Sequence, residues 1–178
     1  MQTVHTGLKI PVKKGSGAGA DGSALKSAAL IDLQQQFEGV EYILVDEMSM
    51  VGQDSLGLMS IRGRQVVAGR TPDGNDERER GLFGGLTVIL VGDPMQLPSV
   101  GAAPIWSDRP GTAGHTVEDR AAWLGLNAAV ELTEVMRQVG QAQAAFRRAL
   151  LAVAEGRALK EHFDLLWTRM RSQVSEAE

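Results

Sequence analysis

The sequence predicts an α/β fold in which a parallel sheet is flanked by helices. Two short runs that are apolar throughout, residues 42–45 and 86–91, have the pattern of strands covered on both faces. Segments with helical spacing of apolar residues precede and follow these runs. Strands that alternate with helices in this way favour a parallel sheet with helices on both sides.

The helices are predicted from apolar spacing and from the residues that end them. A helix is expected over residues 24–37, with Gly39 as its stop signal. A weaker helix is expected over 54–67, because two glycines lower its helical propensity. Further along the chain we expect a third strand over 129–132, a helix over 141–155 and a last helix over 159–170.

Composition excludes several classes of protein. The 178 residues suffice for one domain, or a domain with an appendage, and 43% hydrophobic content suffices for a core. The chain has no cysteine, which excludes disulfides and thiolate metal sites. No apolar run approaches the ~20 residues of a membrane span. The net charge of −4 does not indicate a nucleic-acid binder, so any such binding requires local basic patches.

Acidic residues follow both predicted strands. Asp46 and Glu47 come directly after the first apolar run, and Gly92-Asp93 follow the second. Because ligands bind beyond the carboxyl ends of parallel strands, both acidic turns are expected to face one crevice. An Asp there can hold Mg²⁺, and a Glu there can orient or deprotonate a water that attacks a phosphate. The alternative is a strand that ends in two solvated acids, and the acidic pair alone does not separate the two interpretations.

Longer motifs are more specific. The strings ILVDEMSMV, FGGLTVILVGDPMQLPSVG and ELTEVMRQ resemble, in order and spacing, motifs II, III and IV of superfamily 1 DNA helicases of the RecD and Pif type. The FGG and LPSV elements are similar to the Pif-type branch, which includes Helitron-related members. The opening TVHTGLKI also resembles a segment of that family. The resemblance covers residues 3–170 and implies a RecA-like P-loop NTPase core.

The resemblance implies roles for four residues at a nucleotide site, with ATP and Mg²⁺ as cofactors. Asp46 would bind the Mg²⁺ of Mg-ATP, and Glu47 would be the catalytic base for water. Gln96 would sense the γ-phosphate and couple it to the DNA site. Arg137 would contact the γ-phosphate in the transition state, since its guanidinium suits phosphate geometry.

The resemblance also implies that Thr3 and His5 lie near bound single-stranded DNA. A structural role is the alternative for His5. The alternative for Gln96 is that it caps its turn, and the alternative for Arg137 is that it is a surface residue. Asp93 is interpreted as stabilising its own turn rather than as a second metal ligand.

Other arginines and the tryptophans receive structural interpretations. The arginine pairs are interpreted as solvated faces and the tryptophans as packing anchors, rather than as contacts to phosphates or bases. These residues are Arg62/Arg64, Arg78/Arg80, Arg147/Arg148, Trp106, Trp123 and Trp167.

The sequence contains no G-x-x-x-x-G-K-[ST] string, the phosphate loop whose amides and lysine hold the phosphates in this class. The glycine-rich residues 13–24 do not substitute, because they lack the Gly-Lys-Ser/Thr order. Motifs V and VI are also absent. We therefore expect the latter half of a first RecA-like core, with a partial core at 1–138, a following helical segment at 139–171 and a frayed tail at 172–178.

The resemblance implies an ATP-dependent DNA helicase of 5′-to-3′ polarity, in the DNA repair, recombination and telomere-maintenance class. Its partner would be single-stranded or duplex DNA, and it would act inside the cell, in the nucleus or mitochondrion of a eukaryote or otherwise in the cytoplasm. The isolated chain is expected to be inactive. The alternative is a non-catalytic helicase remnant that binds DNA or a partner. An exposed sheet edge is expected to drive self-association.

Overall fold

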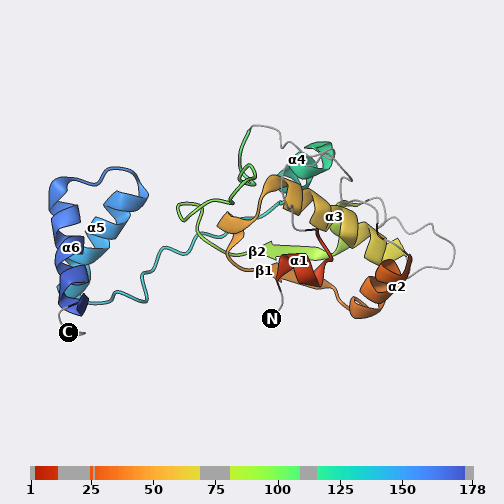
Figure 1. Ribbon diagram of the computed structural model, residues 1–178, viewed down its shortest axis with the longest axis horizontal. Coiled ribbons are helices and arrows are strands. Elements are labelled where there is room, and N and C mark those ends of the chain that lie inside the picture. The colour runs from red at the N-terminus through yellow and green to blue at the C-terminus, as the bar shows by residue number, and fades with distance from the viewer. Residues whose placement is uncertain (1–2, 12–24, 26, 69–80, 109–115, 175–178) are drawn as a thin grey trace. The chain divides into compact units, whose positions relative to one another are not determined.

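A computed structural model describes residues 3–11, 25, 27–68, 81–108 and 116–174 of the protein (Figure 1). The contacts within the chain divide it into two compact units, Met1–Ala128 and Ala129–Glu178. This division comes earlier than residue 138, where we expected the partial core to end.

The first unit contains a two-stranded parallel sheet. Strands β1 (Tyr42–Val45) and β2 (Thr87–Leu90) pair residue for residue over their whole length. Both strands lie within the predicted apolar runs, and the predicted parallel pairing is confirmed. Helix α3 (Gln53–Ala68) connects them, as expected of a crossover between parallel strands.

The two faces of the sheet differ in burial. Val45 is buried and Ile43 packs against the core, whereas the alternate residues Tyr42 and Leu44 are 64% and 66% exposed. Ile89, which pairs with Leu44, is 43% exposed. Among the described residues, the core therefore covers one face of the sheet, and not both as expected. An apolar run shows that both faces of a strand suit burial, but burial itself requires a partner element.

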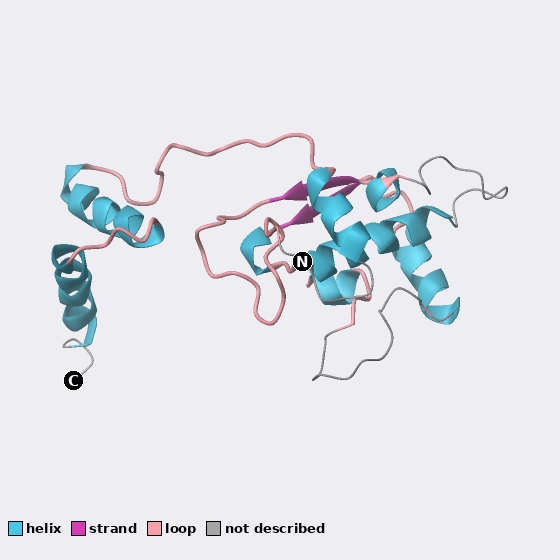
Figure 2. Cartoon of the chain, turned by 90° about the horizontal axis from the view of Figure 1, so that it is seen from above, coloured by secondary structure: helices cyan, strands magenta, loops and turns pink. Residues whose placement is uncertain are grey.

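Helix α3 forms the centre of the core. Leu56 and Met59 are fully buried in it and cluster with Val45 of β1 and with Ile105. Figure 2 shows the two strands side by side next to the helices of this unit. The other elements are α1 (Val4–Gly7), α2 (Ser27–Gln36), the 3₁₀ turns η1 (Met48–Met50) and η3 (Leu82–Gly85), and α4 (Thr116–Leu124).

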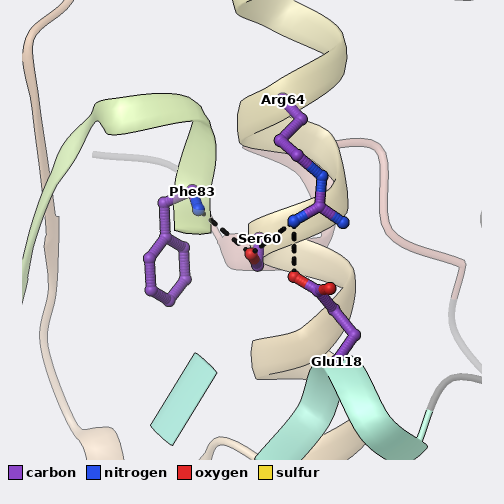
Figure 3. A network of polar contacts seen from close by, with 4 residues as sticks. All are labelled: Ser60, Arg64, Phe83 and Glu118. Atoms are coloured by element: carbon purple, nitrogen blue, oxygen red, sulfur yellow. Dashed lines mark hydrogen bonds and ion pairs between the residues drawn. The ribbon is translucent and has the colours of Figure 1, made fainter. Parts of the chain in front are cut away.

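A polar network links α3 to η3 and α4 (Figure 3). The Phe83 N–H donates to the Ser60 hydroxyl at 3.0 Å, and Arg64 donates to the same hydroxyl at 3.4 Å and to Glu118 Oε1 at 2.7 Å. A Cβ at Gly63 would lie 2.2 Å from the Phe83 carbonyl oxygen. Gly63, which lowers the helical propensity of this segment, therefore allows η3 to approach the backbone of α3.

The structure corrects the interpretation of two arginines in α3. Arg62 is 1% exposed and Arg64 is half-buried, so the solvated-face interpretation is wrong for this pair. Trp106 and Trp123 pack against the core, which confirms their role as anchors. Trp167, in the second unit, is 60% exposed and is no anchor within its unit.

The second unit contains η4 (Gln141–Gln143) and two helices that pack on each other, α5 (Ala144–Ala154) and α6 (Lys160–Val174). Both predicted helices are confirmed. Helix α6 includes residues 172–174, which we expected to be frayed, and 175–178 lie outside the described residues. Arg147 donates to the Gln138 and Gly140 carbonyls, while Arg148 is exposed.

The third strand expected over 129–132 does not form. These residues have no strand assignment, and the side chains of Val130 and Leu132 are 87% and 89% exposed. Strand propensity leads to a strand only where a neighbour supplies the hydrogen bonds of the ladder.

Some predictions lie outside the described residues. They are the glycine-rich loop at 13–24 and the polar segment that contains Arg78 and Arg80. Among the helices that the structure does describe, none combines the length and the apolar character needed to cross a membrane.

Candidate functional site

The two acidic corners leave the sheet at the same end and are hydrogen-bonded neighbours. The paired residues Val45 and Leu90 end the two strands. The Val91 N–H donates to the Val45 carbonyl at 2.8 Å, and the Met48 N–H donates to the Val91 carbonyl at 2.9 Å. The backbone just after Glu47 is thus bonded to the residue just before Gly92. The two turns therefore lie side by side, as expected, and the crevice between them stays a prediction.

The first corner presents two carboxylates to solvent. Asp46 is exposed and its Oδ1 accepts the Glu47 N–H at 2.9 Å. Glu47 is also exposed and adopts the left-handed conformation, with φ 55° and ψ 49°, at the N-cap position just before η1. The Met50 N–H donates to the Glu47 carbonyl at 3.0 Å and closes the turn.

The second corner is a turn closed by Asp93. Its Oδ1 accepts the Met95 N–H at 2.9 Å, and its carbonyl accepts the Gln96 N–H at 3.1 Å. The interpretation that Asp93 stabilises its own turn is therefore confirmed. Gln96 is exposed, and its side chain makes no hydrogen bond to the part of the chain that the structure describes. It is thus not a side-chain cap of this turn and remains available to a ligand.

The segment after Gln96 returns to the start of α3, a connection that the sequence analysis missed. Gly52 pairs with Pro104, and the Gln53 N–H donates to the Ala103 carbonyl at 2.8 Å. The Gln53 side chain is 2% exposed and donates to the Ser107 carbonyl. No local pattern marks Gln53, because a polar residue at a helix start is ordinarily solvated.

Other predicted site residues lie outside these corners. Arg137 belongs to the second unit, where it is exposed in a stretch without helix or strand, so its approach to a nucleotide stays a prediction. The Thr3 hydroxyl accepts the Thr6 N–H at 3.2 Å as the N-cap of α1. His5 Nδ1 lies 3.2 Å from the Ile10 carbonyl oxygen. Both residues thus have structural contacts, and their proximity to DNA stays a prediction.

The first corner suits a Mg²⁺ ion that is part of a nucleotide complex better than it suits a metal ion held by protein ligands alone. Within the described ranges, no group of three or more His, Asp or Glu side chains gathers as a metal site. Mg²⁺ keeps several waters and takes one or two carboxylates together with phosphate oxygens. The exposed Asp46 carboxylate, with one oxygen not engaged by the Glu47 N–H, suits that coordination.

Solved structures share this fold. A structure of Bacteroides Pif1 bound to single-stranded DNA is 21% identical, with a TM-score of 0.53 over 92% of this chain and 35% of that chain. Unliganded Pif1 from Bacteroides sp. is 22% identical, with a TM-score of 0.54 over 92% and 34%. A structure of Pif1 helicases at forked double-stranded DNA is 20% identical, with a TM-score of 0.54 over 92% and 36%.

The chain therefore spans about a third of these solved helicases and has the α/β fold of part of their RecA-like core. No curated protein matches the sequence. The family model for PIF1-like helicases matches residues 1–163. Because this match covers most of the 178 residues, the chain belongs to the PIF1-like helicase family.

Proposed function

We propose that this chain forms part of an ATP-dependent DNA helicase and contributes the edge of the nucleotide site that holds magnesium and the attacking water. Family membership supports the reaction class. The observation that carries the proposal is the hydrogen bond from the Met48 N–H to the Val91 carbonyl, because it joins the two acidic corners at one end of the sheet.

Three residues at these corners receive roles. The Asp46 carboxylate would hold the Mg²⁺ of Mg-ATP, and this ion would supply positive charge that offsets the charge of the phosphates. Glu47 orients a water and accepts its proton as the water attacks. Gln96 contacts the γ-phosphate from the neighbouring turn, and its exposed side chain is consistent with this role.

The role proposed for Arg137, which belongs to the second unit, comes from the family resemblance. Its guanidinium donates to the γ-phosphate oxygens as charge develops in the transition state. Its exposure supports this role, because the side chain is not committed to the packing of its own unit.

The proposed substrate is DNA. Among the similar structures, one is Bacteroides Pif1 bound to single-stranded DNA, and another concerns DNA unwinding at forked double-stranded DNA by two Pif1 helicases. By family resemblance we propose 5′-to-3′ unwinding in DNA repair or recombination, with Thr3 and His5 near the strand. Such a protein acts inside the cell, in the nucleus or mitochondrion of a eukaryote or otherwise in the cytoplasm.

Calorimetric titration with Mg-ATP tests the nucleotide site. We expect Mg²⁺-dependent binding that Asp46→Asn weakens at least about tenfold, the effect of losing roughly 1.4 kcal/mol. Glu41→Gln is the matched control, because it removes one exposed charge next to the opposite end of β1 and is expected to leave binding unchanged. Absence of Mg-ATP binding would favour the alternative of a non-catalytic module that binds DNA or a partner.

Turnover is a separate question from binding. The sequence contains no phosphate loop, so we expect no ATP hydrolysis by a polypeptide of these residues alone. A DNA-stimulated ATPase activity of the purified chain that Glu47→Gln abolishes would contradict this expectation while supporting the role of Glu47.

We further propose that the sheet promotes self-association. Each of its two strands has one edge without a partner strand among the described residues, and unpaired edges favour intermolecular pairing. Size-exclusion chromatography over a range of concentrations is expected to show oligomers, and a concentration-independent monomer would contradict the proposal.

A further inference from the structure

The backbone of Glu47 is held in a conformation that residues with side chains disfavour. Its φ of 55° lies in the left-handed region, where only Lys9 and Phe83 join it among the described non-glycine residues. Two hydrogen bonds hold the peptide groups on either side of it. The Glu47 N–H is bonded to Asp46 Oδ1, and the Met48 N–H to the Val91 carbonyl.

Gly92 lies against the peptide that joins Glu47 to Met48. A Cβ at Gly92 would lie 2.7 Å from the Met48 nitrogen, 3.1 Å from Met48 Cγ and 3.4 Å from the Glu47 carbonyl carbon. Gly92 also has a φ of +155°, which residues with side chains rarely adopt. Any side chain at this position therefore displaces the Met48 N–H from the Val91 carbonyl, unless the backbone of Gly92 itself moves.

We propose that Gly92 is a positioning residue for Glu47. By leaving room for the Glu47–Met48 peptide, it allows the hydrogen bond to Val91 that fixes the left-handed conformation of Glu47 and hence the direction of its carboxylate. This inference rests on the proposed role of Glu47 as the base for water. The second corner thus positions Glu47 of the first corner through Gly92, in addition to making the γ-phosphate contact proposed for Gln96.

Gly92→Ala tests this proposal by NMR on the nucleotide-free chain. We expect the three-bond HN–Hα coupling and the ¹³Cα shift of Glu47 to leave their left-handed values. We also expect the Met48 amide to exchange up to about tenfold faster, the effect of losing one hydrogen bond. The Val91 amide, which donates to Val45, is expected to keep its protection, which separates displacement of Glu47 from general unfolding of the sheet.

Gly101→Ala is the matched control. Gly101 also has a positive φ, +73°, but a Cβ there would have no atom within 4 Å. This variant incurs a left-handed backbone penalty in the segment that follows Gln96 without touching the first corner. The signals of Glu47 and Met48 are expected to remain as in the parent chain.

A second measurement applies if Gly92→Ala does not fold. In the parent chain, a scalar coupling across the hydrogen bond from the Met48 ¹⁵N to the Val91 ¹³C′ is expected, and its absence would overturn the proposal. A folded Gly92→Ala with unchanged Glu47 and Met48 signals would overturn it equally. Neither measurement involves nucleotide, so failure here leaves the Mg-ATP titration as an independent test of the proposed function.

Discussion

The two units of the molecule differ in how much of their apolar surface is buried. Of the described hydrophobic residues that are buried, all but one lie in Met1–Ala128, and the exception is Ala149 of α5. In the second unit, Leu151 and Phe163 are each 56% exposed. The Asp46-Glu47 corner thus follows a buried core residue, Val45, whereas Arg137 precedes a pair of helices with few buried side chains.

Burial beneath a residue affects how firmly its side chain is positioned. A side chain is positioned accurately only where the element beneath it is held by packing, because short helices alone are marginal in water. The Asp46-Glu47 corner meets this condition, because Val45 just before it clusters with Leu56 and Met59 of α3. Arg137, which is exposed in a stretch without helix or strand, does not meet this condition within its own unit.

The largest expected effect comes from truncating a core leucine. Leu56→Ala in α3 removes a fully buried side chain and is expected to lower the free energy of unfolding of the first unit by ~2–5 kcal/mol. Denaturant unfolding, followed by the fluorescence of Trp106 and Trp123, measures it.

Leu151→Ala in α5 is the matched control for that variant, since the same atoms leave a side chain that is 56% exposed. Its expected effect is within about 0.5 kcal/mol. Equal losses for the two variants would contradict the contrast between the units.

A smaller effect is expected from the buried hydroxyl in Figure 3. Ser60→Ala leaves the Phe83 N–H without its acceptor inside the core and is expected to cost ~1–3 kcal/mol. Thr168→Ala removes an exposed hydroxyl whose partner is the Leu165 carbonyl within α6, and its expected cost is within about 0.5 kcal/mol. Urea unfolding of both variants measures these changes in the free energy of unfolding. A Ser60→Ala protein as stable as its parent would show that this hydroxyl contributes nothing to stability.

The smallest effect concerns an ion pair on the surface of the first unit. The hydrogen bond from Lys9 lowers the pKa of Asp32, and the charge of Lys9 lowers it further. Because the pKa is lower in the folded state, the pair stabilises the fold above the unfolded pKa, and this contribution is lost as the pH falls through the folded pKa. We expect Lys9→Met to raise the pKa of Asp32 in an NMR titration, and salt to weaken the difference. An unchanged titration would exclude the pair.

The sequence predicted the parts of the fold that depend on local pattern. The two apolar runs became paired strands, and their parallel direction put the acidic corners at one end of the sheet. Four of the helices also lie close to their predicted ranges. These features follow from side-chain periodicity and from the geometry of parallel strands, both of which are visible in sequence.

The features that were missed depend on contacts between distant segments. Val130 and Leu132 have side chains typical of a strand, but they pair with no strand among the described residues. Arg62 carries a charge, which is typical of surface residues, yet it is one of the buried residues of α3. The burial of Gln53 depends on the return of the segment at Ala103 and Ser107, which no local pattern indicates. In each case the tertiary partner decides the outcome.

We propose that the Asp46-Glu47 corner and the Gly92–Gln96 corner form one site for a metal-bound nucleotide. Mn²⁺ added with ATP in place of Mg²⁺ broadens the NMR signals of nearby residues and tests this claim directly. We predict that the amide signals of Glu47 and Gln96 broaden together and that Asp46→Asn abolishes both effects. Broadening at one corner without the other, or broadening that persists in Asp46→Asn, would contradict the claim.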